Sequence, residues 1–374
     1  MRYYYQVCII TQAARPGKLK AGDASFPRPR PAAKGRTDEQ VGIVPHRVDT
    51  GWLVVQAGLL PVVGCRSASS TDKAPRVLCS VFPVFLLAQA VAQGSGLQVE
   101  LMLPANMGCP HDYSLSPEDM RKLTSADVLI VNGLGLEEFL GEPIRKANPR
   151  LKTIRAGEGI EGLLEIEDDH DEHAQPATVP ATSAAKDGHV HGPDCEHRHE
   201  GLNPHVFASP RMAARMARKI AGELARAYPA HARLFADNAA RVAGELDALA
   251  DEFAQAGKTF ARRKIVTEHA VFDYLARDGG LEIVAVIEEA PGQEPSAARM
   301  IELVKQVKDS HAAAVFTEPQ YPAKVGQTIA REANVPVAGL DPVASGPDGA
   351  GIDYYHKTMR ENLGTLRKIL GTRE

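Results

Sequence analysis

The chain has 374 residues, enough for two domains, and its 44% content of hydrophobic residues is typical of a folded protein rather than a disordered one. Its formal net charge is −4, but the first 64 residues contain nine Lys or Arg against four Asp or Glu, so the rest of the chain carries the acidic excess. An acidic body argues against nucleic acid as a partner and suits a cationic ligand. The five cysteines form no CxxC pair and predict no disulfide framework.

Residues 1–75 predict an export region rather than a folded domain. Residues 14–40 are rich in Pro, Gly and Arg, as in disordered segments, and they fit a start codon assigned too far upstream. Residues Gly51–Val63 form an apolar run that is too short to span a bilayer but typical of a signal-peptide core. The run leads into Val-Val-Gly-Cys, which resembles a bacterial lipobox with Cys65 as the lipidated residue, and a polar tether follows. The alternative is a buried strand followed by an ordinary core cysteine.

From Arg76 onward, short β-rich runs alternate with amphipathic stretches, which predicts an α/β fold of mostly parallel sheets flanked by helices. In the first half we expect strands at 77–81, 97–103, 128–131 and near 153, and helices at 85–92, 117–124 and from about 137. In the second half we expect strands at 264–267, 282–287, 313–316 and 335–340, and helices at 271–276, 296–307, 323–332 and 354–370.

Two further helices are expected between the halves, at 209–227 and 231–256. The longer one contains no Pro and would act as a rigid connection between two lobes. We therefore expect an amino-terminal lobe at 76–228, a linking helix at 229–258 and a carboxy-terminal lobe at 259–374, each lobe with a central mostly parallel sheet.

Four metal-competent side chains lie where a predicted strand ends or a capped helix begins: His111, His205, His269 and Asp341. In open α/β sheets, ligands bind beyond the carboxyl ends of the strands. Two of the four come from each half, so a cleft between the lobes would bring them together. Three imidazoles and a carboxylate suit Zn²⁺ and leave Mn²⁺ or Fe²⁺ possible. Any one of them alone would more simply be a polar loop residue.

Six other histidines fall within thirty residues: His170, His173, His189, His191, His197 and His199. Residues 157–203, which contain them, are too polar and too rich in Gly and Pro to build a core, and loops this long are usually functional or disordered. Paired histidines with acids nearby can hold zinc loosely in several arrangements. We expect a weak accessory metal loop beside the main site, and the alternative is a solvated acidic loop with incidental histidines.

Five stretches between Arg76 and the carboxyl terminus resemble the zinc/manganese ABC-transporter solute-binding protein family: PHDYSLSPEDMRKLTSADVLIVNGLGLEEFL, NPHVFASP, VTEHAVFDYLARDGGLE, FTEPQYPAKVGQTIA and LDP. The resemblance implies one divalent cation held between two lobes joined by a long helix, with ligands at His111, His205, His269 and Asp341. A histidine at the third of these positions is typical of zinc-binding members, whereas manganese-binding members have Glu. Zinc-binding members of the family often insert a His- and acid-rich loop at the place of the loop described above.

The resemblance further implies a non-enzymatic role. The protein would be exported, periplasmic or lipid-anchored, and would deliver Zn²⁺ to the membrane permease of an ABC importer. We expect a monomer that meets the membrane only through its lipid. A manganese- or iron-binding relative, a zinc buffer and an adhesin on the same fold remain alternatives.

The chain departs from the family pattern beside two ligands. Family segments usually read DPHVW and HDAF, where this chain has Asn203 before Pro-His and Ala270 after His269. Because a hydrogen-bond acceptor fixes the tautomer of a metal-binding histidine, we expect these changes to alter affinity rather than abolish the site. Asp112, Glu268 and Glu318 are acids available nearby, and the sequence does not show which of them orient the ligands. Cys109 could approach a metal but is more simply a small buried loop residue.

Two enzyme-like patterns are weaker. Residues 189–197 (HVHGPDCEH) have the wrong spacing for an HxHxDH hydrolase motif, and the chain contains no HExxH. The GLGLEEFLG stretch lacks the glycine spacing of a dinucleotide loop. A zinc hydrolase is therefore the least favoured alternative.

Overall fold

Two four-stranded parallel sheets of identical topology organise the protein. The computed structural model describes residues 74–372 apart from 109, 111–112, 166–200 and 289–293. The first sheet has the order β2-β1-β3-β4 and consists of β1 (Arg76–Cys79), β2 (Gln98–Leu101), β3 (Val128–Val131) and β4 (Lys152–Arg155). The second sheet has the order β6-β5-β7-β8 and consists of β5 (Lys264–Thr267), β6 (Glu282–Val286), β7 (Val315–Thr317) and β8 (Val337–Gly339).

The inner strands are the most apolar, whereas the edge strands β2 (QVEL) and β4 (KTIR) also carry polar and charged residues. All four residues of β3, VLIV, are buried, as expected of an inner strand in a sheet covered on both faces. β3 pairs with β1 in register from Val77 and Val128 onward. The pairing of β5 with β6 shifts by one residue between Ile265 and Val266, so the β-structure of the second sheet is slightly irregular there.

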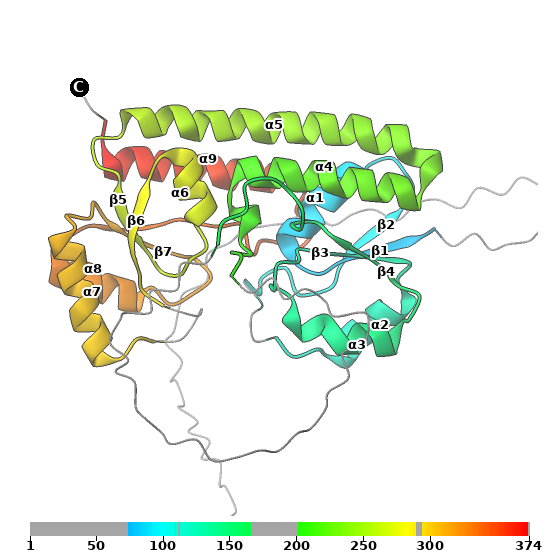
Figure 1. The fold of residues 1–374 in the computed structure, drawn as a ribbon, viewed down its shortest axis with the longest axis horizontal. Helices are drawn as coiled ribbons and strands as arrows, with labels where there is room; N and C mark the ends of the chain where they lie inside the picture. Colours follow the sequence, from blue (N-terminus) through cyan, green and yellow to red (C-terminus); the bar gives the residue numbers. More distant parts are fainter. Residues whose placement is uncertain (1–73, 109, 111–112, 166–200, 289–293, 373–374) are drawn as a thin grey trace, which may run out of the picture. The chain divides into compact units, whose positions relative to one another are not determined.

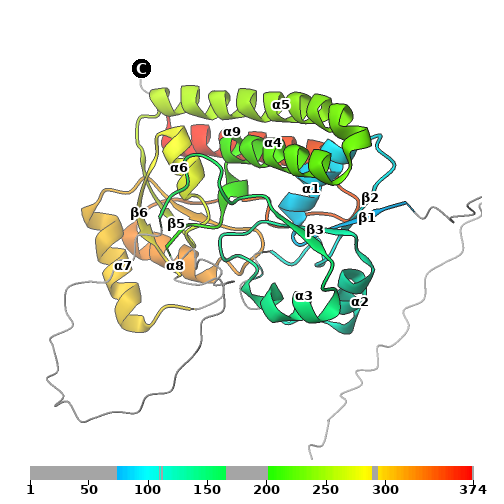
Figure 2. The same cartoon turned by 45° about the vertical axis from the view of Figure 1, so that its right-hand side comes forward.

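Helices connect the strands and cover the sheets (Figures 1 and 2). Those of the first half are α1 (Phe82–Ala92), α2 (Pro117–Ser125), the 3₁₀ turn η1 (Glu138–Leu140) and α3 (Gly141–Ala147). The helices that lie between the two sheets in the sequence are η2 (Val206–Ala208), α4 (Pro210–Ala227), η3 (Pro229–His231) and α5 (Ala232–Thr259). Those of the second half are α6 (Asp273–Gly279), α7 (Ala297–Asp309), α8 (Lys324–Ala333) and α9 (Ile352–Leu370).

Serine residues begin three of these helices. Ser116 and Asp119 form a reciprocal capping box at the start of α2, where Pro117 occupies the first helical position. Ser209 accepts a hydrogen bond from the backbone N–H of Met212 at the start of α4, and Ser296 caps α7 in the same way. These caps fix the points at which loops give way to helices.

The predicted α/β fold of parallel sheets flanked by helices is confirmed. The largest differences are at element boundaries. Helix α1 begins at Phe82, three residues earlier than predicted, and the helix expected from about 137 is divided into η1 and α3. Helix α6 begins at Asp273 rather than 271, because the preceding residues form the loop that carries His269.

A continuous apolar core spans both halves of the chain. Helix α5 buries one face built from Phe235, Ala239, Val242, Leu246 and Leu249, with helical spacing. Its 28 residues extend about 42 Å and pack against α1, α4, α6 and α9. Both views show α4 and α9 lying along α5 (Figures 1 and 2). The predicted linking helix is therefore packed against other helices rather than exposed on all sides.

A second, smaller core fills the space between the second sheet and helices α7 and α8. Its residues include Val266, Ile287, Leu303 and Ile329. Within the described ranges, none of the helices has both the length and the apolar composition needed to cross a bilayer.

Two glycines of α5 provide a matched test of this packing. A Cβ at Gly257 would lie 1.9 Å from the carbonyl oxygen of Gly279 at the end of α6, whereas a Cβ at exposed Gly244 meets nothing within 4 Å. We expect Gly257→Ala to lower the free energy of unfolding by about 1–3 kcal/mol, as overpacked sites do. Gly244→Ala should raise it by roughly 0.5–1 kcal/mol, because alanine is the better helix former.

Urea unfolding of the full chain measures both changes. Equal effects of the two substitutions would contradict the close approach of α5 and α6.

Candidate metal site

His269 follows β5 and lies buried beside a carboxylate that follows the neighbouring strand β7. Its Nδ1 is 2.6 Å from Oε1 of Glu318, and both side chains are almost fully buried. Nδ1 and Oε1 are close enough for an ion pair but lie outside hydrogen-bond geometry. A carboxylate at this distance favours the tautomer with the proton on Nδ1 and the lone pair on Nε2. Nε2 is buried and has no hydrogen-bond partner among the described residues. This is the arrangement in which histidine binds a metal while a carboxylate orients the ring.

Other buried acids surround His269. Glu268 is 1% exposed, and its Oε2 accepts a hydrogen bond from the backbone N–H of Glu318 at 2.7 Å. Burial, together with the nearby carboxylates of Glu318 and Glu288, raises the pKa of Glu268 to about 7. Burial also raises the pKa of Glu318. A cation bound beside these groups would lower their pKa values and favour their ionised forms.

His205 lies next to His269. The two ring centroids are 5.1 Å apart and the ring planes meet at 78°. His205 is the residue directly before η2. Asn203 Oδ1 lies 3.0 Å from His205 Nδ1 and accepts a hydrogen bond from the His205 backbone N–H at 2.9 Å. The pairing of His205 with His269 brings together two of the four predicted ligands.

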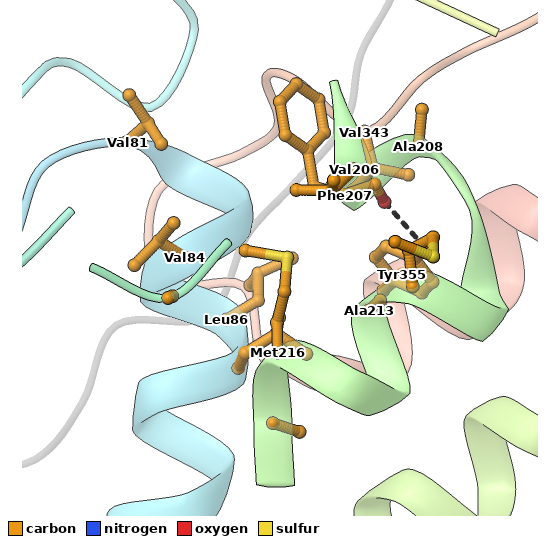
Figure 3. Packing of buried hydrophobic residues seen from close by; sticks show 14 of the residues in the cluster. Val81, Val84, Leu86, Val206, Phe207, Ala208, Ala213, Met216, Val343 and Tyr355 are labelled. Atoms are coloured by element: carbon orange, nitrogen blue, oxygen red, sulfur yellow. Dashed lines mark hydrogen bonds between the residues drawn. The ribbon is translucent and has the colours of Figure 1, made fainter. Parts of the chain in front are cut away.

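The segment that carries His205 is anchored in the main core. Val206, Phe207 and Ala208 are fully buried and pack against α1 and α4 (Figure 3). The hydroxyl of Tyr355 on α9 donates a hydrogen bond to the Phe207 carbonyl at 2.7 Å, drawn as the dashed line in Figure 3. His205 thus projects from a turn that packing and a buried hydrogen bond hold in place.

Asp341 follows β8 in a turn that engages its carboxylate. Oδ1 accepts hydrogen bonds from Gln320 Nε2 at 3.0 Å and from the Val343 backbone N–H at 2.8 Å. Val343 has a φ of 62°, a left-handed conformation that costs a β-branched residue about 1–3 kcal/mol. Asn362 on α9 hydrogen-bonds both the N–H and the carbonyl of Asp341. Desolvation raises the pKa of the Asp341 carboxyl.

A loop from the first half approaches the same region. A Cβ at Gly108 would lie 3.4 Å from Gln320 Cβ and 3.4 Å from the Tyr321 hydroxyl oxygen. The Tyr321 ring centroid is 6.0 Å from that of His269, and the Gln320 side chain donates a hydrogen bond to Asp341. The chain around Gly108, three residues before His111 in the sequence, therefore lies close to the second-half residues of the candidate site.

The structure brings some of the predicted residues together and leaves others outside its described part. His205 and His269 are in contact, whereas Asp341 is linked to this region through Gln320. No group of three His, Cys, Asp or Glu side chains converges at metal-binding distance within residues 74–372 as far as they are described. The predicted residues outside the described ranges are His111, Cys109, Asp112, His170, His173, His189, His191, His197 and His199.

The sequence does not show which acids orient the imidazoles. In the structure, Glu318 lies against Nδ1 of His269, whereas Glu268 accepts a hydrogen bond from the Glu318 backbone. Asn203, which replaces the family's usual Asp, still supplies the acceptor for His205. The roles of Gln320 and Asn362 were not foreseen; only the FTEPQY stretch pointed to the former.

The chain is similar to proteins named for zinc binding and zinc uptake. A family model described as "Zinc-uptake complex component A periplasmic" matches residues 77–369. The "Zinc-binding protein AdcA" of Streptococcus pyogenes is 30% identical over 296 residues, which cover 78% of this chain and 55% of that protein. The "High-affinity zinc uptake system protein ZnuA" of Bacillus subtilis is 24% identical over 331 residues, covering 86% of this chain and 97% of that protein. The chain thus spans about half the length of the AdcA relatives it matches.

Solved structures agree on the fold. A crystal structure of ZnuA superposes with a TM-score of 0.63 and 25% identity, covering 80% of this chain and all of that one. Zn(II)-bound AdcA from Streptococcus pneumoniae superposes with a TM-score of 0.61 and 27% identity, covering 80% of this chain and 58% of that one.

Proposed function

The chain belongs to the family of periplasmic zinc-uptake components, and from this premise we propose that it binds Zn²⁺ outside the cytoplasm and delivers it to the membrane permease of an ABC importer. Its role is that of a solute-binding protein, not of an enzyme. The observation that carries the proposal is the buried pair His205 and His269, in which each Nδ1 faces an oxygen acceptor. With the proton on Nδ1, an imidazole has its lone pair on Nε2, the atom through which histidine can bind zinc.

The proposed ligands are His111, His205, His269 and Asp341. Imidazole nitrogen suits zinc, while manganese prefers oxygen, so a site with three histidines favours Zn²⁺. The names of the AdcA and ZnuA relatives, which specify zinc, support the same metal. A relative of known structure, FpvC from Pseudomonas aeruginosa, is described in complex with Mn²⁺, so Mn²⁺ is the alternative ion.

We also propose the two-lobe division for which the two sheets provide the framework: residues 76–228, the linking helix at 229–258, and residues 259–374. In this division His205 comes from the first lobe and His269 and Asp341 come from the second. The protein would act as a monomer, with the permease as its protein partner.

Replacing His269 tests the site directly. In His269→Ala the zinc Kd should rise by more than about 100-fold, because losing a ligand exceeds the 10–100-fold effect of losing an orienting group. At zinc concentrations well above the Kd of the unmodified protein and that of the variant, a 100-fold higher Kd lowers the zinc-dependent stabilisation by about 2.7 kcal/mol. Chelator competition on metal-free protein measures the Kd, and thermal melts with and without zinc measure the stabilisation.

The control is His231→Ala, which removes a histidine of η3 that contacts the Phe235 ring instead of the site. Its zinc affinity should equal that of the unmodified protein. Unchanged affinity in His269→Ala would remove His269 from the site.

We propose that the six clustered histidines bind zinc weakly, as an accessory loop beside the main site. They are His170, His173, His189, His191, His197 and His199. Deleting residues 170–199 should abolish weak zinc binding and leave one tight site, because none of the four proposed ligands lies in that range. Isothermal titration calorimetry distinguishes the two classes of site. Loss of the tight site on deletion would show that the loop supplies an essential ligand.

We propose export through the apolar run at Gly51–Val63 and lipid attachment at Cys65. The S. pneumoniae relative is named a zinc-binding lipoprotein, which supports a lipid anchor. Intact-mass measurement of protein purified from membranes should show an acylated chain that begins at Cys65. A mature chain that begins elsewhere, without acyl groups, would contradict the anchor, and Cys65→Ser is the matched variant that should not be acylated.

A further inference from the structure

Asn203 makes a buried set of hydrogen bonds in two directions. Its Oδ1 faces the Nδ1 and backbone N–H of His205, at 3.0 and 2.9 Å. Its Nδ2 donates to the Ala270 carbonyl at 2.9 Å and to Asp273 Oδ2 at 2.7 Å. The residue is only 3% exposed. One amide therefore connects the His205 segment to the loop and helix that follow His269.

The backbone partners fix the orientation of this amide. The His205 N–H can only donate and the Ala270 carbonyl can only accept, so the oxygen of Asn203 must face the former and its nitrogen the latter. An amide oxygen next to Nδ1 can only accept, so the His205 proton must reside on Nδ1. The lone pair of the neutral ring is then on Nε2.

A second contact reinforces the connection. The Tyr274 hydroxyl of α6 donates to the Asn203 carbonyl at 2.7 Å and accepts from the Leu164 N–H at 3.1 Å. Both the side chain and the main chain of Asn203 are thus hydrogen-bonded to residues that follow His269, in its loop and at the start of α6.

We propose that Asn203 is a positioning residue of the metal site, which selects the metal-binding tautomer of His205 and ties this imidazole to the segment that carries His269. The inference rests on the proposed function, because it takes His205 to be a zinc ligand. An aspartate at this position would accept from His205 but could not donate to Ala270, and it would place a second carboxylate against Asp273. The asparagine suits this chain because position 273 is acidic.

Three variants separate these roles. Asn203→Ala removes both the acceptor and the donors. Asn203→Asp keeps the acceptor, removes the donors and sets two carboxylates together. Asn203→Asp with Asp273→Asn reverses the pair, because the new amide at 273 can donate to the carboxylate at 203. Asp273→Asn alone is the matched control for the change at 273.

The first readout is the tautomer of His205 in metal-free protein, from the ¹⁵N shifts of its ring nitrogens. We expect a proton on Nδ1 in the unmodified protein and in Asn203→Asp, and a mixture of tautomers in Asn203→Ala. The second readout is zinc Kd by chelator competition. Asn203→Ala and Asn203→Asp should each raise it by about 10–100-fold, and the double variant should recover most of the affinity that Asn203→Asp loses.

Urea unfolding of each metal-free variant shows whether it is folded, and if Asn203→Ala is not, the comparison of Asn203→Asp with its double variant decides. An unchanged tautomer and Kd in every folded Asn203 variant would overturn the positioning role. A failure of the proposed function looks different: His205→Ala would then leave zinc affinity unchanged. Weakened binding in His205→Ala with no effect at Asn203 rejects only the present inference.

Discussion

The contact between His269 Nδ1 and Glu318 depends on the order of strands in the second sheet. His269 follows β5 and Glu318 follows β7, and these strands are neighbours because the chain crosses from β6 on one side to β7 on the other. Parallel strands end on the same side of a sheet, so residues that follow adjacent strands meet there. The crossing point is the topological switch point at which α/β folds bind ligands.

The first sheet has the same strand order, but the residues at its switch point support the His205 segment. Its switch point lies between β1 and β3, where Glu137 accepts hydrogen bonds from the Ser80 hydroxyl and from the Asn132 and Gly133 backbone N–H groups. Asn132 Nδ2 in turn donates to the Pro204 carbonyl at 2.8 Å. The residue before His205 is therefore held by the switch point of the first sheet. One switch point carries the proposed ligand His269 and the carboxylate beside it, and the other supports the segment that carries His205.

The sequence predicts the parts of this arrangement that depend on local pattern. Strand ends follow from short apolar runs, so His269 and Asp341 were correctly placed after strands. The acceptors depend on contacts between distant segments. Glu268 and Glu318 both follow strands, and only the folded structure shows that Glu318 faces the imidazole. Replacement of Asp by Asn at 203 suggested a weakened acceptor, but the amide oxygen still accepts and its nitrogen bonds residues about seventy positions away.

The proposed ligands differ in how much order metal binding would have to create. His205 and His269 are buried, in contact with each other and oriented by acceptors, so their conformational entropy is already lost in the metal-free fold. Asp341 Oδ1 instead bonds Gln320 and Val343, and coordination through that oxygen would exchange these bonds for a metal bond. Preorganisation lowers the free-energy cost of binding at the groups that have it. Among the proposed ligands that the structure describes, the two imidazoles are therefore already oriented, which favours an ion that prefers imidazole nitrogen over one that prefers carboxylate oxygen.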